Sequence, residues 1–133
     1  MTRSLPFHSK PKTRQRPEAR LQKALVQILR LQCNPGVLWF STFNERKGVR
    51  AMADMKARGL LPGLADMVFV VSGEVMFLEL KAENGRLSDS QREFLKAAHA
   101  AGARYTVANS FESARQTLEM WGVLRAQKMA RAA

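Results

Sequence analysis

The hydrophobic residues near the start of the chain are spaced as in an amphipathic helix. They recur every three or four positions, at Leu21, Leu25, Ile28 and Leu29. Because residues at this spacing share one face of a helix, the pattern predicts a helix over residues 18–32. Pro17 suits the first helical turn, where a missing backbone N–H costs nothing. The Asn-Pro-Gly sequence at residues 34–36 predicts the end of this helix.

Two apolar runs in the middle of the chain predict a β-hairpin. Residues 66–71 and 75–80 are almost entirely hydrophobic, and a short Ser-Gly-Glu segment separates them. Short apolar runs divided by turn residues are typical of paired, buried strands. Residues 37–43 are rich in aromatic and branched side chains and predict another strand. The basic residues 46–58 between these strands are expected to form a helix or a loop.

The second half of the chain carries two helix-start signals on either side of a strand. Ser88 and Gln91 are spaced as in a capping box, which predicts a helix directly after Ser88. Residues 104–108 predict a short strand, and Ser110 is expected to cap a last helix. From Arg125 the chain is expected to continue as a basic helical tail. The order α-β-(α)-β-β-α-β-α predicts an α/β sandwich with a mixed sheet flanked by helices.

The predicted hairpin brings two carboxylates together. If Ser72 and Gly73 form a two-residue loop, then Asp66 lies directly opposite Glu79. Lys81 shares the face of Glu79 because side chains alternate along a strand. Opposed like charges destabilise a sheet, and a divalent cation between them removes that cost. This pattern fits a metal site for phosphodiester hydrolysis, and it fits equally well a solvated Glu79–Lys81 pair at a strand end, with Asp66 as a turn residue.

The charge of the chain indicates a polyanionic partner. The formal net charge is +11 over 133 residues and the pI is near 10.9, which favours nucleic acid. The alternatives are a surplus for solubility, or a ribosome-like or membrane-surface protein. Cys33 is the single cysteine, so an intramolecular disulfide is excluded and a reducing cytoplasm is favoured. No apolar run approaches the ~20 residues of a membrane span, and residues 1–16 predict a flexible basic arm without a secretory signal.

The order of these pieces resembles the PD-(D/E)xK nucleases, and specifically the VRR-NUC domain. That family has an N-terminal helix with an acidic residue followed by Leu-Gln, then a Gly-x-Pro-Asp strand start, Glu-x-Lys and a Ser-x-x-Gln helix start. The corresponding segments here are Glu18-Ala19-Arg20-Leu21-Gln22, Gly63-Leu64-Ala65-Asp66, Glu79-Leu80-Lys81 and Ser88-Asp89-Ser90-Gln91. The resemblance extends over residues 18–121, most of the chain. Ala65 stands where the family usually has Pro.

The resemblance implies a catalytic centre that uses Mg²⁺ or Mn²⁺. Asp66 and Glu79 are expected to bind the metal, with the Leu80 carbonyl as a candidate third ligand. Lys81 is expected to be the catalytic lysine. Glu18 shares a helical face with apolar residues and is expected to point toward the metal or its water. Its alternative role is that of a helix-start acid interacting with the helix dipole.

Two further sets of residues have both a functional and a structural interpretation. Gln91 is expected to reach the catalytic centre, but its capping-box position explains it equally well. A polar and basic segment is expected to contact DNA phosphates, or else to be a solvated charged face. Its members are Asn44, Arg46, Lys47, Arg50, Lys56 and Arg58.

The resemblance implies a structure-selective DNA endonuclease that acts on branched DNA such as a Holliday junction. Two symmetry-related cuts imply a homodimer, and a bacterial or phage-infected cytoplasm is the expected location. The alternative is a non-catalytic nucleic-acid-binding module that kept the nuclease fold. The complete Asp66, Glu79 and Lys81 set disfavours that alternative. The expected organisation is the arm at 1–16, the nuclease domain at 17–124 and a basic C-terminal tail at 125–133.

Overall fold

The chain folds into four helices and four strands within the part that the structure describes. The computed structural model describes residues 16–43 and 48–127, with only the backbone of residues 48–51. The elements are α1 (Pro17–Gln32), β1 (Leu38–Ser41), α2 (Gly48–Ala57), β2 (Met67–Val71), β3 (Glu74–Leu80), α3 (Asp89–Ala100), β4 (Arg104–Ala108) and α4 (Phe111–Met120). This order confirms the α-β-α-β-β-α-β-α arrangement predicted from the sequence.

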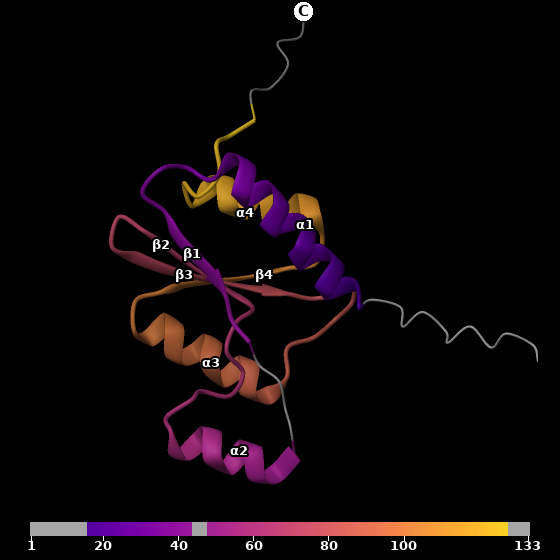
Figure 1. Ribbon diagram of the computed structural model, residues 1–133, viewed down its shortest axis with the longest axis vertical. Coiled ribbons are helices and arrows are strands. Elements are labelled where there is room, and N and C mark those ends of the chain that lie inside the picture. The colour runs from indigo at the N-terminus through magenta and orange to yellow at the C-terminus, as the bar shows by residue number, and fades with distance from the viewer. Residues whose placement is uncertain (1–15, 44–47, 128–133) are drawn as a thin grey trace, which may run out of the picture.

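The strands form a mixed sheet in the order β1-β2-β3-β4 (Figure 1). β2 pairs with β1 and with β3 in antiparallel fashion, and β4 runs parallel to β3. Parallel neighbours need a long crossover connection, which α3 supplies here. The predicted mixed sheet flanked by helices is therefore confirmed.

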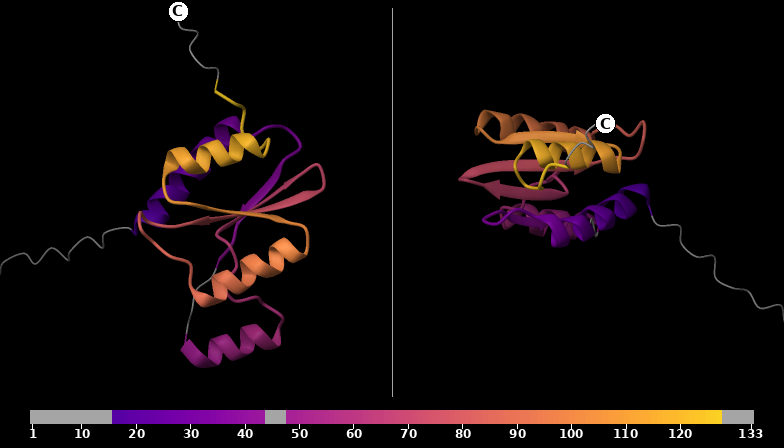
Figure 2. Two further views of the ribbon diagram at one scale, coloured as in Figure 1. Left: turned by 180° about the vertical axis from the view of Figure 1, so that it is seen from behind. Right: turned by 90° about the horizontal axis from the view of Figure 1, so that it is seen from above.

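Helices cover both faces of this sheet. Figures 1 and 2 show α1 and α4 on one side and α3 on the other, with α2 lying beyond α3. Side chains of β3 alternate between these faces, so Leu78 packs in the core under α1 and α4 while Phe77 packs toward α3. The same alternation directs Glu79 to the α3 face.

Local signals fix where the helices begin. Pro17 occupies the first turn of α1. At α3 the Ser88 hydroxyl accepts a hydrogen bond from the Gln91 backbone N–H at 3.3 Å, and the Gln91 side chain accepts one from the Ser88 N–H at 2.9 Å. This is the predicted capping box. Ser110 caps α4 in the same way with Ser113.

The end of the chain differs from the prediction of a helical tail. α4 stops at Met120, and residues 125–127 are not helical. Gly122 adopts the left-handed conformation (φ +76°), which ends a helix, and Leu124 then pairs with Cys33 in a β-bridge. These contacts turn the chain away from the helix axis, so the prediction is wrong for 125–127; residues 128–133 lie outside the described part.

Among the described residues, no helix is both long and apolar enough to cross a membrane.

Candidate active site

The register of the β2–β3 hairpin places Asp66 opposite Glu79. Val71 pairs with Glu74 and Met67 with Leu78, so the next pair along the hairpin is Asp66 with Glu79. Ser72 and Gly73 form the two-residue loop, both with positive φ (51° and 80°). Such a turn matches the twist of paired strands. The loop length predicted from the sequence is confirmed, and with it the opposition of the two carboxylates.

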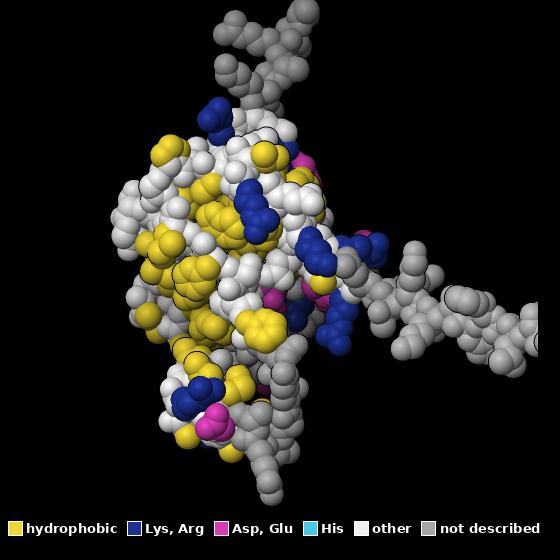
Figure 3. All heavy atoms as spheres, in the orientation of Figure 1, with side chains coloured by type: hydrophobic (Ala, Val, Ile, Leu, Met, Phe, Trp, Pro, Cys, Tyr) yellow, Lys and Arg dark blue, Asp and Glu magenta, His cyan; other side chains and the backbone are white. Residues whose placement is uncertain are grey.

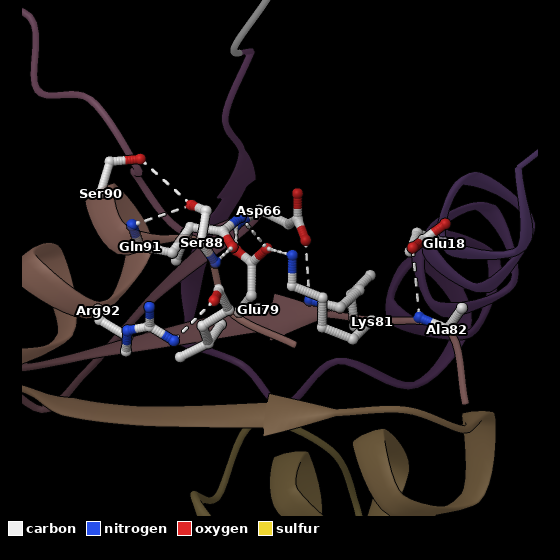
Figure 4. A network of polar contacts seen from close by, with 12 residues as sticks. Glu18, Asp66, Glu79, Lys81, Ala82, Ser88, Ser90, Gln91 and Arg92 are labelled. Atoms are coloured by element: carbon white, nitrogen blue, oxygen red, sulfur yellow. Dashed lines mark hydrogen bonds and ion pairs between the residues drawn. The ribbon is translucent and has the colours of Figure 1, made fainter. Parts of the chain in front are cut away.

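Each carboxylate is held by a backbone N–H of the opposite strand (Figure 4). The Asp66 N–H donates to Glu79 Oε2 at 3.2 Å, and the Leu80 N–H donates to Asp66 Oδ2 at 2.8 Å. Hydrogen bonds of this kind to charged acceptors are stronger than those between neutral groups. They orient both side chains on the face of the sheet that α3 covers.

Two further side chains reach the other carboxylate oxygen of Glu79, Oε1. Gln91 Nε2 donates to Glu79 Oε1 at 2.8 Å, and Lys81 Nζ lies 3.6 Å from it. The Glu79 side chain is only 3% exposed and that of Lys81 17%. Gln91 thus serves both in the capping box and at the carboxylate cluster, so its two sequence interpretations hold together.

Glu18 approaches the same end of the sheet from α1. Its Oε1 accepts a hydrogen bond from the Ala82 N–H at 3.3 Å, so the carboxylate points inward rather than into solvent. Figure 4 shows it beyond Lys81, separate from the Asp66–Glu79 pair. Burial is the main cause that raises the pKa of Asp66, and the charge of Glu18 adds to it. Glu18 therefore borders the cluster without contacting the two central carboxylates.

A glycine brings the strand start against α3. Gly63 has a φ of +71°, and a Cβ built there would lie 2.3 Å from the Ser90 carbonyl carbon. This approach seats the Gly63–Asp66 segment on the first turn of α3, which also carries Gln91. Ala65, where the family usually has Pro, is fully buried, and its carbonyl accepts a hydrogen bond from the Thr42 hydroxyl.

Burial raises the pKa values of both central carboxyl groups. The pKa of Glu79 is raised to about 7, first by burial and then by the negative charge of Asp66. Burial also raises the pKa of Asp66, although the Leu80 N–H and the Lys81 charge oppose this. Two carboxylates in such a setting favour any added positive charge, whether a proton or a cation.

The comparisons with known proteins agree with this geometry. The family model of the VRR-NUC domain matches residues 16–112. This chain belongs to the VRR-NUC family. Two solved structures are similar: one titled "VRR_NUC domain protein" has a TM-score of 0.63 at 15% identity, covering 84% of this chain and 98% of its own. The other, "VRR_NUC domain", has a TM-score of 0.54 at 20% identity, covering 79% and 97%. No curated protein matches.

Membership of the VRR-NUC family shows the fold and implies the class of activity. The VRR-NUC domain is a PD-(D/E)xK nuclease fold, so the resemblance found in the sequence is confirmed. A nuclease domain implies hydrolysis of the phosphodiester bonds of nucleic acid, with DNA as the implied substrate. The likeness to the two solved structures supports the fold alone, because both are below 25% identical.

The carboxylates of this VRR-NUC domain have the composition that a hard divalent cation needs. Among residues 16–43 and 48–127, no group of three or more His, Cys, Asp and Glu side chains is gathered to hold a metal. Mg²⁺ commonly takes only one or two carboxylates and completes its shell with water and phosphate oxygens. The second carboxylate oxygen of Asp66 has no hydrogen-bond partner among the described residues. The carboxylates of Asp66 and Glu79 therefore fit Mg²⁺ or Mn²⁺ when water and the phosphate oxygens of a substrate complete the shell.

Sequence reasoning overlooked Tyr105, a β4 residue that faces the cluster. Phe77 is its register partner, and its ring packs against Phe94 with centroids 6.1 Å apart. Its hydroxyl is buried without a hydrogen-bond partner among the described residues. Burial and the charges of Glu79 and Asp66 raise its pKa. Only the parallel pairing of β3 with β4 brings it here, and no local pattern indicates that pairing.

Of the residues predicted to contact DNA, Lys56 and Arg58 have described side chains, and they lie apart from the carboxylates. Lys56 and Arg58 are exposed on and after α2, which α3 separates from the sheet (Figure 1). Arg58 pairs with Asp54 at 3.2 Å. Arg50 lies in α2 with its side chain outside the description. Asn44, Arg46 and Lys47 lie outside the described residues.

Proposed function

We propose that this VRR-NUC domain is a Mg²⁺- or Mn²⁺-dependent endonuclease that cuts branched DNA, such as a four-way junction. The observation that carries the proposal is the buried Asp66–Glu79 pair with Lys81 beside it. A protein gains no stability from opposed, buried carboxylates, so their presence calls for a functional reason. Hydrolysis of a phosphodiester supplies one.

Asp66 and Glu79 would bind the cation through their carboxylates. The Leu80 N–H points at Asp66, and the two backbone groups of a strand residue point to the same side, so the Leu80 carbonyl is available as a third ligand. Glu18 would hold a water at the border of the site. A bound divalent cation lowers the pKa of a coordinated water and offsets negative charge on the phosphate.

Lys81 and Gln91 have separate tasks in this proposal. Lys81 is anchored near Glu79 but partly exposed, so its ammonium can donate to a non-bridging oxygen of the scissile phosphate. Charge stabilisation of this kind contributes most where water is excluded. Gln91 fixes the orientation of Glu79 through its amide, which makes it a positioning residue.

Selectivity for branched DNA rests on the described elements and on symmetry. Residues 16–43 and 48–127 are taken up by the helices and strands of the nuclease fold, and they contain no separate unit for reading bases in a groove. Recognition of DNA shape then becomes the simpler route. Resolution of a four-way junction needs two cuts related by symmetry, which a homodimer would supply.

The test separates catalysis from binding. Asp66→Ala, Glu79→Ala and Lys81→Ala should each abolish nicking of a labelled four-way junction in Mg²⁺ or Mn²⁺. DNA binding in Ca²⁺ should remain, because affinity comes from many surface cations. Lys81→Ala should still bind metal, since an ammonium is not a ligand. Glu93→Ala, which removes an exposed carboxylate paired only with Lys96, is the matched control and should cut normally.

The outcomes distinguish the candidate functions. Cutting of linear duplex as fast as the junction would remove the selectivity and leave the nuclease. Normal cutting by Glu79→Ala would refute the mechanism. Binding without cutting by the unmodified chain, on every DNA and RNA structure tried, would favour a non-catalytic binding module.

A further inference from the structure

The outward face of α1 carries a row of basic side chains that the catalytic proposal does not use. Positions 16, 20, 23, 27 and 30 follow the three- and four-residue spacing that places side chains along one face of a helix. They hold Arg16, Arg20, Lys23, Gln27 and Arg30, and all five are exposed. Leu25 and Leu29 are buried on the opposite side of the helix. We call Arg16, Arg20, Lys23 and Arg30 the α1 basic row.

The charges of the α1 basic row are not compensated by the described residues. None of the four forms an ion pair with an acidic side chain in the described part, whereas the exposed Arg58, Lys96 and Arg104 all do. Glu18 is the one acidic residue of α1, and it points inward to Ala82. Figure 3 shows dark-blue side chains over α1, with magenta ones near its start. A positive strip next to a carboxylate site is the electrostatic pattern expected where a polyanion lies.

A groove runs beside this row. It has a volume of about 440 Å³ between α1 and the end of β1, and its lining includes Gln22, Lys23, Gln27, Arg30 and Ser41. Amide, hydroxyl, ammonium and guanidinium groups are the side chains that contact DNA phosphates and sugars. These polar groups lie beside the apolar Ala19 and Val26, and they give the groove side chains that can contact a DNA backbone.

The row also leads to the proposed catalytic centre. Glu18 lies in the first turn of α1 and contacts Ala82, the residue after Lys81. A helix rises 1.5 Å per residue, so Arg16 to Arg30 extends about 21 Å from that point. At about 3.4 Å per nucleotide, this length corresponds to roughly six nucleotides of one strand.

We infer that the α1 basic row is a phosphate-binding track for the backbone of a double-stranded DNA arm that leads into the Asp66–Glu79 site. This inference rests on the proposed nuclease function and adds a surface that the sequence did not indicate. The row sets position and affinity without touching the reacting phosphate. It therefore acts in binding and not in the chemical step.

The experiment compares two variants of the full chain that lose equal charge. The row variant is Arg20→Gln/Lys23→Gln/Arg30→Gln, which keeps good helix formers on α1. The control is Lys96→Gln/Arg104→Gln/Arg125→Gln, three exposed basic residues outside the row. Fluorescence anisotropy with a labelled duplex and a labelled junction in Ca²⁺, over a series of salt concentrations, gives the affinity and its salt dependence. Thermal unfolding verifies that both variants fold.

The row variant should bind more weakly, and its salt slope should fall by up to about 2.7, because each lost phosphate contact removes about 0.9. The control should keep a slope near that of the unmodified chain. Cleavage in Mg²⁺ by the row variant should need a higher DNA concentration to reach half of its maximum rate. Equal losses of slope in both variants would show that general charge holds the DNA and would overturn the track alone. If the unmodified chain cuts DNA but the row variant binds DNA normally, the proposed phosphate-binding track is refuted and the proposed nuclease function is not. No DNA binding by the unmodified chain would overturn both.

Discussion

The contact between Gly63 and the start of α3 allows a stability prediction that does not depend on any activity. Gly63→Ala adds one methyl group at a φ of +71°, where it would lie 2.3 Å from both the carbonyl carbon and oxygen of Ser90 and 2.6 Å from the Gln91 nitrogen. These are backbone atoms of a capped helix, so they cannot rotate away as a flexible side chain would. Either α3 or the strand start must move.

Two costs add for this substitution. A left-handed conformation costs an L-residue roughly 1–2 kcal/mol. Forcing a methyl group into a filled space typically costs about 1–3 kcal/mol more. Gly63→Ala should therefore lower the free energy of unfolding by about 2–5 kcal/mol. Movement at Gln91 would also disturb its hydrogen bond to Glu79, so cleavage should fall by more than the folded fraction does.

Gly73→Ala is the matched control. Gly73 has a φ of +80° but nothing lies within 4 Å of the Cβ built there, so it pays only the conformational cost. Both substitutions restrict the unfolded chain equally. Urea unfolding of the two variants should differ by about 1–3 kcal/mol at equal m-values, which isolates the close approach. Equal losses of unfolding free energy in the two variants would refute the reasoning, because they would show that α3 moves aside without an energetic cost.

Three further predictions concern charge and burial. The folded-state pKa of Glu79 is raised from 4.5 to about 7, so the free energy of unfolding without metal should fall as the pH rises from 4.5 to about 7. Urea unfolding in EDTA over this pH range should show the decrease. Glu79→Gln should make the decrease smaller. Tyr105→Phe removes a buried hydroxyl that has no hydrogen-bond partner among the described residues, so the free energy of unfolding should not fall, or should rise by up to about 1–3 kcal/mol; a clear loss in thermal unfolding would reveal a partner for that hydroxyl. Deleting residues 1–15 removes four basic side chains and should lower the salt slope of DNA binding by up to about 3.6 without slowing cleavage at saturating DNA; an unchanged slope would show that the arm makes no phosphate contacts.

The sequence by itself determined the elements and the central carboxylate pair. Short apolar runs, turn residues and helical spacings are local, and they predicted the order of helices and strands. The Ser72-Gly73 loop fixed the hairpin register, because paired positions in a hairpin follow from loop length alone. Asp66 opposite Glu79, with Lys81 on the same face, was therefore available from short-range information.

The tertiary structure decided which distant residues meet that pair. Parallel pairing of β3 with β4 brings Tyr105 to the cluster, and the packing of α1 against the sheet brings Glu18 to Ala82. The approach of Gly63 to α3 directs Gln91 at Glu79 as well as at its cap. These contacts join segments far apart in the chain, and their free energy comes from shared burial that no local spacing records. The same packing exposed a basic face on α1, whereas the sequence drew attention to residues 46–58.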